Sequence, residues 1–372
     1  MNSNKKLLLY IVYAALILIV PEVVGTLGGN YWVRVLDFAM LYVMLALGLN
    51  VVVGFTGLLD LGYIAFYAVG AYTAALLSSP HLPTHFEWIA HALPGGMHSP
   101  YLLIAVVGMV LAAFFGVLLG APTLRLRGDY LAIVTLGFGE IVRIFMNNLY
   151  SPINFTNGPQ GINNVDPVHF GAFSLDKDHT LFGFTITGSM QYYYLFLLGS
   201  LLVIAVCTRL QSSRIGRAWA AIREDELAAK AMGINTRNMK LLAFAMGASF
   251  GGLAGSMFGA FQGFVSPESF TFWESTVVLA CVVLGGMGHI PGVILGALLM
   301  SIFPEVLRVT VGPIQQHLFG HEIVSPSIIR QGVYGISMVL IMLYRPAGLW
   351  PAPKHEDRMA KLSKQNGKQA AA

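Results

Sequence analysis

Long apolar runs that contain almost no charged residue constrain the fold of this chain more than any other feature. Ten runs of helix-like length follow one another along the sequence: 7–24, 36–53, 61–79, 101–121, 130–148, 191–208, 240–262, 272–286, 291–309 and 327–344. An α-helix needs about 20 apolar residues to cross the hydrocarbon core of a bilayer. Only 11% of the residues are charged, whereas a soluble domain has about 25%. The sequence therefore predicts an all-α, polytopic helical membrane protein with about ten transmembrane helices, and excludes a large soluble globule, a collagen-like fibre and a disordered chain.

Basic residues set the expected orientation, because lysine and arginine in short loops mark the cytoplasmic side. Two lysines precede the run 7–24, which lacks a clear cleavage site after it and is expected to be an uncleaved span rather than a secretory signal. The loop 80–100 has no lysine or arginine, and Lys177 is the one basic residue of the loop 149–190. We expect both loops to be periplasmic.

Most of the other basic residues lie in one connecting segment and in the tail. Segment 209–240 contains seven of them: Arg209, Arg214, Arg217, Arg223, Lys230, Arg237 and Lys240. The tail 351–372 contains five more and has the composition of a disordered end. We expect the segment, the tail and both termini to be cytoplasmic. This orientation requires the stretch 272–309 to cross twice, so we expect a helix break at 285–292.

Two glycine-rich bends, 54–62 and 285–292, resemble each other and lie between apolar runs without a basic residue. Backbone that leaves the helical form at membrane depth is tolerated only where protein or a watery cavity covers it, and such broken helices form substrate sites in transporters. Ordinary close helix packing through small residues is the alternative. The candidate residues of a translocation path are Gly54, Thr56, Gly57, Asp60, Gly62, Gly285, Gly286 and Gly288.

A short amphipathic helix is expected within segment 209–240. Asp225 and Glu226 precede the apolar residues 227–232, and acidic side chains suit the first turn of a helix. Gly233 follows them, as a glycine does at the end of a helix. A helix of this kind at the cytoplasmic surface fits a groove on a partner protein. The alternative is a solvated linker, although the segment is long and apolar for one.

The same residues resemble the EAA loop of ABC-importer permeases. Ala228, Ala229 and Gly233 match its pattern, whereas Leu227 stands where that family has glutamate and Glu226 lies one position earlier. The resemblance implies a coupling helix that docks onto an ATPase subunit, formed by Glu224, Asp225, Glu226, Ala228, Ala229 and Gly233.

Longer motifs narrow the resemblance to the branched-chain amino acid importer permeases, and most closely to their LivM-type subunit. The similar stretches run from about 40 to 350: residues 54–66, 126–139, 213–226, Thr156-Asn-Gly-Pro-Gln-Gly161 and Tyr344-Arg-Pro-Ala-Gly-Leu-Trp350. The resemblance implies a permease domain over 1–350 in a bacterial inner membrane that carries leucine, isoleucine and valine. The implied partners are a second permease of the LivH type, two cytoplasmic ATPase subunits and a periplasmic amino-acid-binding protein.

Nothing in the motifs indicates an enzyme. The 372 residues contain no GxxxxGK[ST] phosphate loop, no metal-ligand spacing and no basic–aromatic stretch typical of nucleic-acid binding. We therefore expect no cofactor or metal in this chain, no nucleic-acid partner, and ATP bound by partner subunits.

Ionisable residues inside the apolar runs are the remaining candidates, since each costs at least about 2.5 kcal/mol at mid-membrane depth. Glu140 and Arg143 are one helical turn apart and are expected to form an ion pair. Asp60 is expected either to contact a substrate ammonium group or to cap the next helix. Two alternatives remain: a urea or short-amide importer permease, and an ion-coupled secondary transporter that uses Glu140 and Asp60.

Overall fold

The computed structural model describes residues 18–26, 28–92, 97–124, 126, 128–171, 173–181, 184–319, 321, 325–345 and 348–350. The first expected span lies outside these residues except for its end, which belongs to a helical stretch within 18–26. The tail 351–372 lies outside them entirely.

Long helices account for the other nine apolar runs. They are α2 (Asn30–Asn50), α3 (Ile64–Leu77), α6 (Tyr101–Thr123), α7 (Asp129–Asn148), α8 (Gly188–Ser212), α11 (Thr236–Gln262), α12 (Phe272–Gly285), α13 (Ile290–Phe319) and α14 (Pro326–Tyr344). Among the described residues, six stretches are long and apolar enough to cross a membrane. The chain is therefore a multi-pass helical membrane protein.

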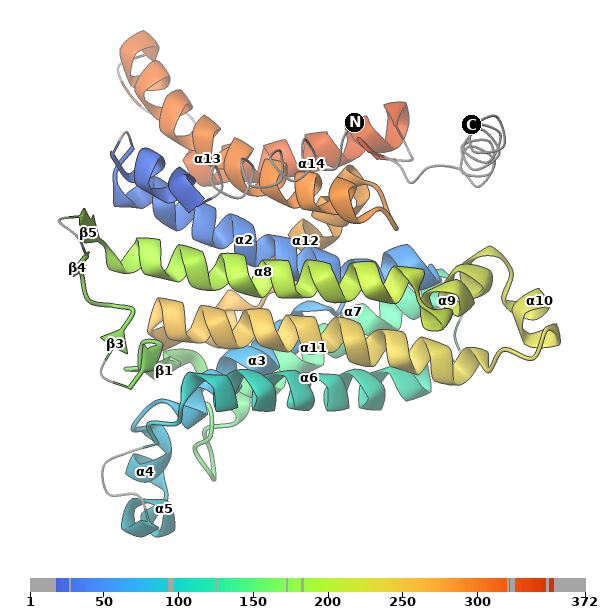
Figure 1. The fold of residues 1–372 in the computed structure, drawn as a ribbon, viewed down its shortest axis with the longest axis horizontal. Coiled ribbons are helices and arrows are strands. Elements are labelled where there is room, and N and C mark those ends of the chain that lie inside the picture. The colour runs from blue at the N-terminus through green and yellow to red at the C-terminus, as the bar shows by residue number, and fades with distance from the viewer. Residues whose placement is uncertain are drawn as a thin grey trace, which may run out of the picture.

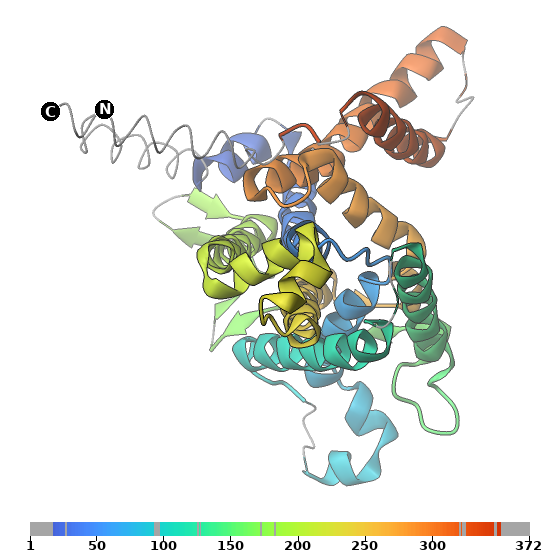
Figure 2. The same cartoon turned by 90° about the vertical axis from the view of Figure 1, so that its right-hand side faces the viewer.

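Helices α2, α6, α8 and α11 run side by side along the long axis of the molecule (Figure 1). Seen nearly end-on, α2 and α3 lie in the middle of the bundle, and α13 and α14 lie to one side (Figure 2). Small residues let α11 approach its neighbours closely, because a Cβ atom on Gly252 would come within 2.6 Å of the Ala112 Cβ of α6. Dispersion contacts between close backbones hold such bundles together where lipid gives no hydrophobic driving force.

Short elements cluster at the two ends of the bundle. One end, called here the strand end, holds three antiparallel strand pairs: β1 (Ile162–Asn163) with β6 (Phe264–Val265), β2 (His169–Phe170) with β3 (Phe173–Ser174), and β4 (His179–Leu181) with β5 (Phe184–Ile186). It also holds α4 (His81–His85), α5 (Glu87–Ala92), η2 (Gly158–Gln160) and η3 (Pro267–Ser269) (Figure 1). The opposite end, called the α10 end, carries α9 (Arg214–Glu224) and α10 (Glu226–Ala231). Loops 80–100 and 149–190 thus share one end, and segment 209–240 lies at the other.

Both glycine-rich bends interrupt helices. The stretch 272–309 divides where the sequence predicts: α12 ends at Gly285 and α13 begins at Ile290, with Gly286 and Gly288 at φ 116° and 85°. Helix α2 continues as a π-helical turn, η1 (Val51–Phe55), and Gly57 at φ 74° then turns the chain toward α3. Positive φ values favour glycine, which has no Cβ to clash.

Candidate functional site

Helix α10 is defined by caps at both ends. The Asp225 Oδ1 atom accepts hydrogen bonds from the backbone N–H groups of Leu227 at 2.8 Å and Ala228 at 3.1 Å. At the other end, Gly233 has φ 84° and donates from its N–H to the Lys230 carbonyl at 3.1 Å. These caps let a helix of six residues keep its shape away from the bundle.

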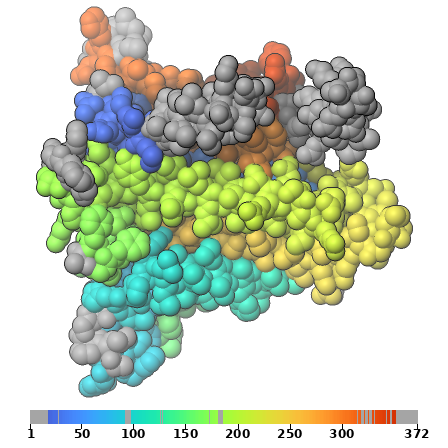
Figure 3. Space-filling model, viewed as in Figure 1, coloured from blue at the N-terminus to red at the C-terminus, as the bar shows by residue number. Residues whose placement is uncertain are grey.

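One face of α10 is fixed to the protein and the other is free. Glu226 Oε1 lies 2.6 Å from Nζ of Lys240, a residue of α11 that is only 4% exposed. Ala229 is buried, whereas Leu227 is 64% and Met232 is 83% exposed. The α9–α10 region projects from the end of the molecule (Figure 3). An exposed apolar pair on an anchored, projecting helix is the shape expected of a docking element.

Helix α9 joins α10 to the first bend. Its N-terminus is capped by Ser213, whose Oγ accepts from the Gly216 N–H at 3.2 Å. Trp219 is fully buried, donates from Nε1 to the Met239 carbonyl of α11 at 2.8 Å, and stacks on the Phe55 ring of η1 at 6.4 Å. Movement of α9 would therefore act directly on η1.

Arg223, near the end of α9, reaches the place where the two bends meet. Its Nη1 donates to the Gly54 carbonyl at 2.5 Å, and a Cβ atom on Gly288 would lie 2.6 Å from the same nitrogen. Asn50 Oδ1 accepts from the Gly288 N–H at 2.8 Å, and Gln211 Nε2 donates to the Gly288 carbonyl at 3.3 Å. The bends are far apart in sequence, yet they touch each other and α9.

Neither Arg223, Asn50 nor Trp219 stood out as a site residue in the sequence. Arg223 was one of seven basic residues in its segment, and Asn50 lay at the end of an apolar run. A lone polar residue next to a glycine-rich bend is the signal that would have identified Asn50.

The other candidates of the translocation path mostly serve close packing. The Thr56 hydroxyl donates to the Val52 carbonyl at 2.6 Å, and Asp60 Oδ1 accepts from the Gly62 N–H at 2.9 Å. Gly62 packs against the backbone of α7 at Gly139, and Gly285 packs against Gly292 of α13. Of these residues, the structure brings Gly54, Gly57 and Gly288 together around Arg223. That they line a path stays a prediction.

Glu140 and Arg143 lie on one turn of α7. Arg143 donates from Nε to Glu140 Oε1 at 2.9 Å, and its Nη1 lies 3.5 Å from Glu268 of η3. The guanidinium thus ties α7 to the loop that precedes α12, which suits a structural role.

Comparison with known proteins gives a consistent result. A family profile described as "Branched-chain amino acid transport system / permease component" matches residues 31–342. The chain is 44% identical over 331 residues to the high-affinity branched-chain amino acid transport system permease protein LivM of Escherichia coli K12, covering 86% of this chain and 70% of the relative. It is 43% identical over 350 residues to LivM of Salmonella typhimurium, covering 91% and 74%.

A more distant relative is the permease protein LivH of Escherichia coli K12, at 26% identity over 264 residues, covering 70% of this chain and 80% of the relative. No solved structure matches the chain. The profile extends from the beginning of α2 almost to the end of α14, and two LivM proteins share more than two fifths of their aligned residues with this chain. The chain belongs to the family of branched-chain amino acid transport system permease components.

Proposed function

We propose that this chain is the transmembrane permease subunit of an ATP-driven ABC importer, which carries leucine, isoleucine and valine from the periplasm to the cytoplasm. The names and identities of its relatives support the substrate class. The observation that carries the mechanism is the connection from α10 through Trp219 and Arg223 to both glycine-rich bends. It links a projecting, apolar docking helix to breaks in the helices of the membrane domain.

The proposed importer contains a second permease of the LivH type, two ATPase subunits and a periplasmic amino-acid-binding protein. The similarity of this chain to both LivM and LivH proteins supports a pair of related permeases. The ATPases occupy the α10 end and hold the nucleotide, while the binding protein delivers substrate at the strand end.

The proposed topology places about ten spans in a bacterial inner membrane, with both termini in the cytoplasm. The six long apolar stretches, together with α3, α7, α14 and the run 7–24, make up this number. The seven basic residues of segment 209–240 support the cytoplasmic assignment of the α10 end.

In this mechanism, closure of the ATPases on ATP moves α10. The cap at Asp225 and the ion pair between Glu226 and Lys240 keep α10 and the base of α11 together. Helix α9 passes the movement to η1 and to the bend at Gly288, which changes the side from which the path is open. ATP or the loaded binding protein must bind the two states unequally for this exchange to occur.

Reconstitution tests the proposal. The permease pair, the ATPases and the binding protein are placed in proteoliposomes, and uptake of labelled leucine is measured with and without ATP. We expect uptake that requires ATP and all partners and is blocked by excess isoleucine or valine but not by urea. Uptake by this chain alone under an ion gradient, or competition by urea or short amides, would contradict the proposal.

A further inference from the structure

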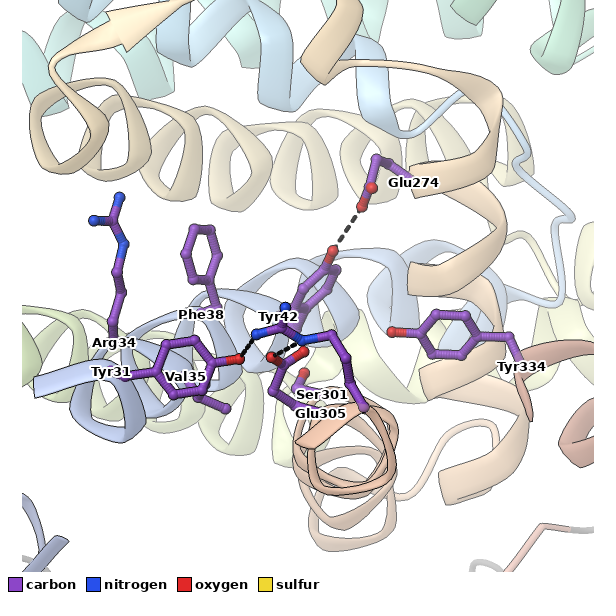
Figure 4. A pocket seen from close by; sticks show the side chains of 10 residues that line it. Tyr31, Arg34, Val35, Phe38, Tyr42, Glu274, Ser301, Glu305 and Tyr334 are labelled. Carbon is purple, nitrogen blue, oxygen red and sulfur yellow. Dashed lines mark hydrogen bonds and ion pairs between the residues drawn. The ribbon is translucent and has the colours of Figure 1, made fainter. Parts of the chain in front are cut away.

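Ionisable side chains of the membrane helices occur in two kinds of surroundings. One group borders a cavity of about 720 Å³ among α2, α12, α13 and α14 (Figure 4). The charged residues of this cavity are Arg34, Glu274, Glu305 and Arg308. Arg34 and Glu274 lie near the beginnings of α2 and α12, so the cavity is in the half of the bundle near the strand end. A space of this volume admits water to its charges. The ion pair of α7 lies instead at the outside of the bundle.

Helix α7 lies at the edge of the bundle, on the side opposite to α8 (Figure 2). One face of it, with Leu131, Thr135 and Gly139, is buried against the other helices. The opposite face, called here the α7 face, consists of Gly137 and of side chains that are at least 50% exposed: Tyr130, Ile133, Ile141, Ile144 and Phe145.

Gly137 leaves open space in the middle of the α7 face. It shares this face with Ile133 and Ile141, because the three are spaced by four residues. Apart from neighbouring residues of α7, no described atom lies within 4 Å of the place of a Cβ atom on Gly137. On the buried face, by contrast, a Cβ atom on Gly139 would lie 3.0 Å from the Gly62 Cα atom. Small residues let the backbones of membrane helices approach each other, so Gly137 offers room for a helix of another protein.

Glu140 borders the α7 face at membrane depth. Its side chain is 36% exposed. Helix α7 has 20 residues, which matches the hydrocarbon thickness of a bilayer, and Glu140 lies about 12 Å or more along the axis from either end of the helix. Lipid tails offer an exposed carboxylate neither a hydrogen-bond donor nor a counter-charge. The surface around Glu140 is therefore a costly one to expose to lipid.

The charges around Arg143 do not balance. Its Nε donates to Glu140 Oε1 at 2.9 Å, and its Nη1 lies 3.5 Å from Glu268 Oε1. Within the described part of the chain, these two carboxylates form ion pairs with Arg143 alone. One guanidinium thus serves two carboxylates, which leaves one negative charge in excess. A lysine or arginine of a neighbouring protein would balance it.

The exposed surfaces of α6 and α8 differ from the α7 face. Leu102 of α6 and Leu198 of α8 are highly exposed, as in a helix that faces lipid. Helix α6 contains no Asp, Glu, Lys, Arg or His, and Arg209 near the end of α8 is the one such residue of that helix. Lipid can cover these two helices without burying a charge.

We propose that the α7 face binds the second permease of the importer, which brings a helix against Gly137 and a lysine or arginine toward Glu140. The inference rests on the proposed function and assigns a surface to that partner. A membrane-embedded partner is required because Gly137 and Glu140 lie at membrane depth. A second copy of this chain would bring the same excess of negative charge to the contact, whereas specific partners have complementary charges.

Photo-crosslinking tests which molecule covers the α7 face. The crosslinking amino acid p-benzoylphenylalanine is incorporated at Ile141, or at Val110 of α6 as the control, and the assembled importer is irradiated in membranes. We expect an adduct with the tagged second permease from position 141 and none from position 110. An adduct from position 141 with a second copy of this chain, or with lipid alone, would overturn the inference.

Gly137→Leu tests the close contact. The leucine fills open space and favours the helix, so thermal unfolding of the chain should stay unchanged or shift upward. The amount of second permease that copurifies should fall about 10-fold, because a tight contact does not accept the added volume. Val110→Phe adds the same number of carbon atoms to the exposed surface of α6 and should retain the partner. A stable Gly137→Leu variant that binds the second permease as the wild type does would contradict the proposed contact.

Glu268→Lys tests the charge. It changes the local excess from one negative to one positive charge, which repels a cation of the partner and should reduce copurification. Glu87→Lys makes the same change at an exposed position of α5 and should have no effect. Equal copurification with both variants would show that the partner brings no cation to this place.

Failure of the surface is distinguishable from failure of the proposed function. If the reconstituted importer carries leucine with ATP while position 141 gives no adduct with the second permease, the function stands and the surface is wrong. If position 141 gives this adduct while the importer carries no leucine, the surface stands and the function is wrong.

Discussion

At the residue scale, Arg223 is the side chain that connects α9 to both glycine-rich bends. Its guanidinium donates to the Gly54 carbonyl and lies against Gly288, so one charged group touches both bends. A hydrogen bond to a charged group contributes about 1.5–3 kcal/mol. Trp219 of the same helix stacks on Phe55 beside Gly54, and Arg223 is the α9 side chain that contacts both Gly54 and Gly288.

We expect Arg223→Ala to lower ATP-driven leucine uptake at least about 10-fold, because about 1.5 kcal/mol of coupling corresponds to a factor of ten. Copurification of the ATPase subunits should stay unchanged, since the Arg223 guanidinium contacts the first bend and the residue is not part of α10. Arg217→Ala is the matched control, because Arg217 is also an exposed arginine of α9 but donates to the Ser212 carbonyl and not to a bend. If the Arg223→Ala variant takes up leucine at the wild-type rate at equal expression, the contact of Arg223 with the bends does not transmit the movement of α9.

At the element scale, the apolar runs and the helix caps predict most of the helices and their ends. They do not predict which helices contact one another. The runs of apolar residues predicted nine described helices, and the glycines at 285–292 predicted the break between α12 and α13. Asp225 and Gly233 predicted both ends of α10, since capping depends on neighbours in the chain. The contact of Arg223 with Gly54 joins residues 169 positions apart, and the cavity requires four helices to assemble. A single sequence does not carry that information.

Helix α10 gives a prediction that depends on its C-terminal cap. Gly233 has φ 84° and open space around the position of a Cβ atom, so a substitution there acts through backbone strain and not through a clash. A left-handed conformation costs an L-residue about 1–2 kcal/mol, and asparagine tolerates it best. We expect Gly233→Ala to weaken ATPase copurification and leucine uptake, and Gly233→Asn to weaken them less.

The measurements for this pair are the ratio of ATPase to permease after purification and the rate of uptake per permease. Membrane insertion of both variants should match the wild type, because α10 lies outside the bundle. Equal effects of alanine and asparagine would rule out the conformational explanation, and no effect of either would speak against docking through α10.

At the scale of the whole molecule, the strand end and the α10 end of the bundle have different roles in the proposed importer. The α10 end presents Leu227 and Met232 on an anchored helix, while the strand end presents loops almost without basic residues. The cavity of about 720 Å³ among α2, α12, α13 and α14 lies toward the strand end and the bends lie toward the α10 end. A substrate that enters at the strand end would reach the cavity first and the bends last, so a movement of α9 would act on the exit side.

This division requires the ends to face opposite sides of the membrane, which cysteine labelling in intact cells can test. The two native cysteines, Cys207 and Cys281, are at most 1% exposed and should give little background. We expect Glu87→Cys to react with a membrane-impermeant maleimide in intact cells, because α5 lies at the strand end, which the proposed topology places in the periplasm. Met232→Cys should react only after the cells are opened, and more strongly when the ATPase subunits are left out, because they cover this exposed side chain. Labelling of the Met232 variant in intact cells would reverse the orientation, and with it the order in which a substrate meets the cavity and the bends.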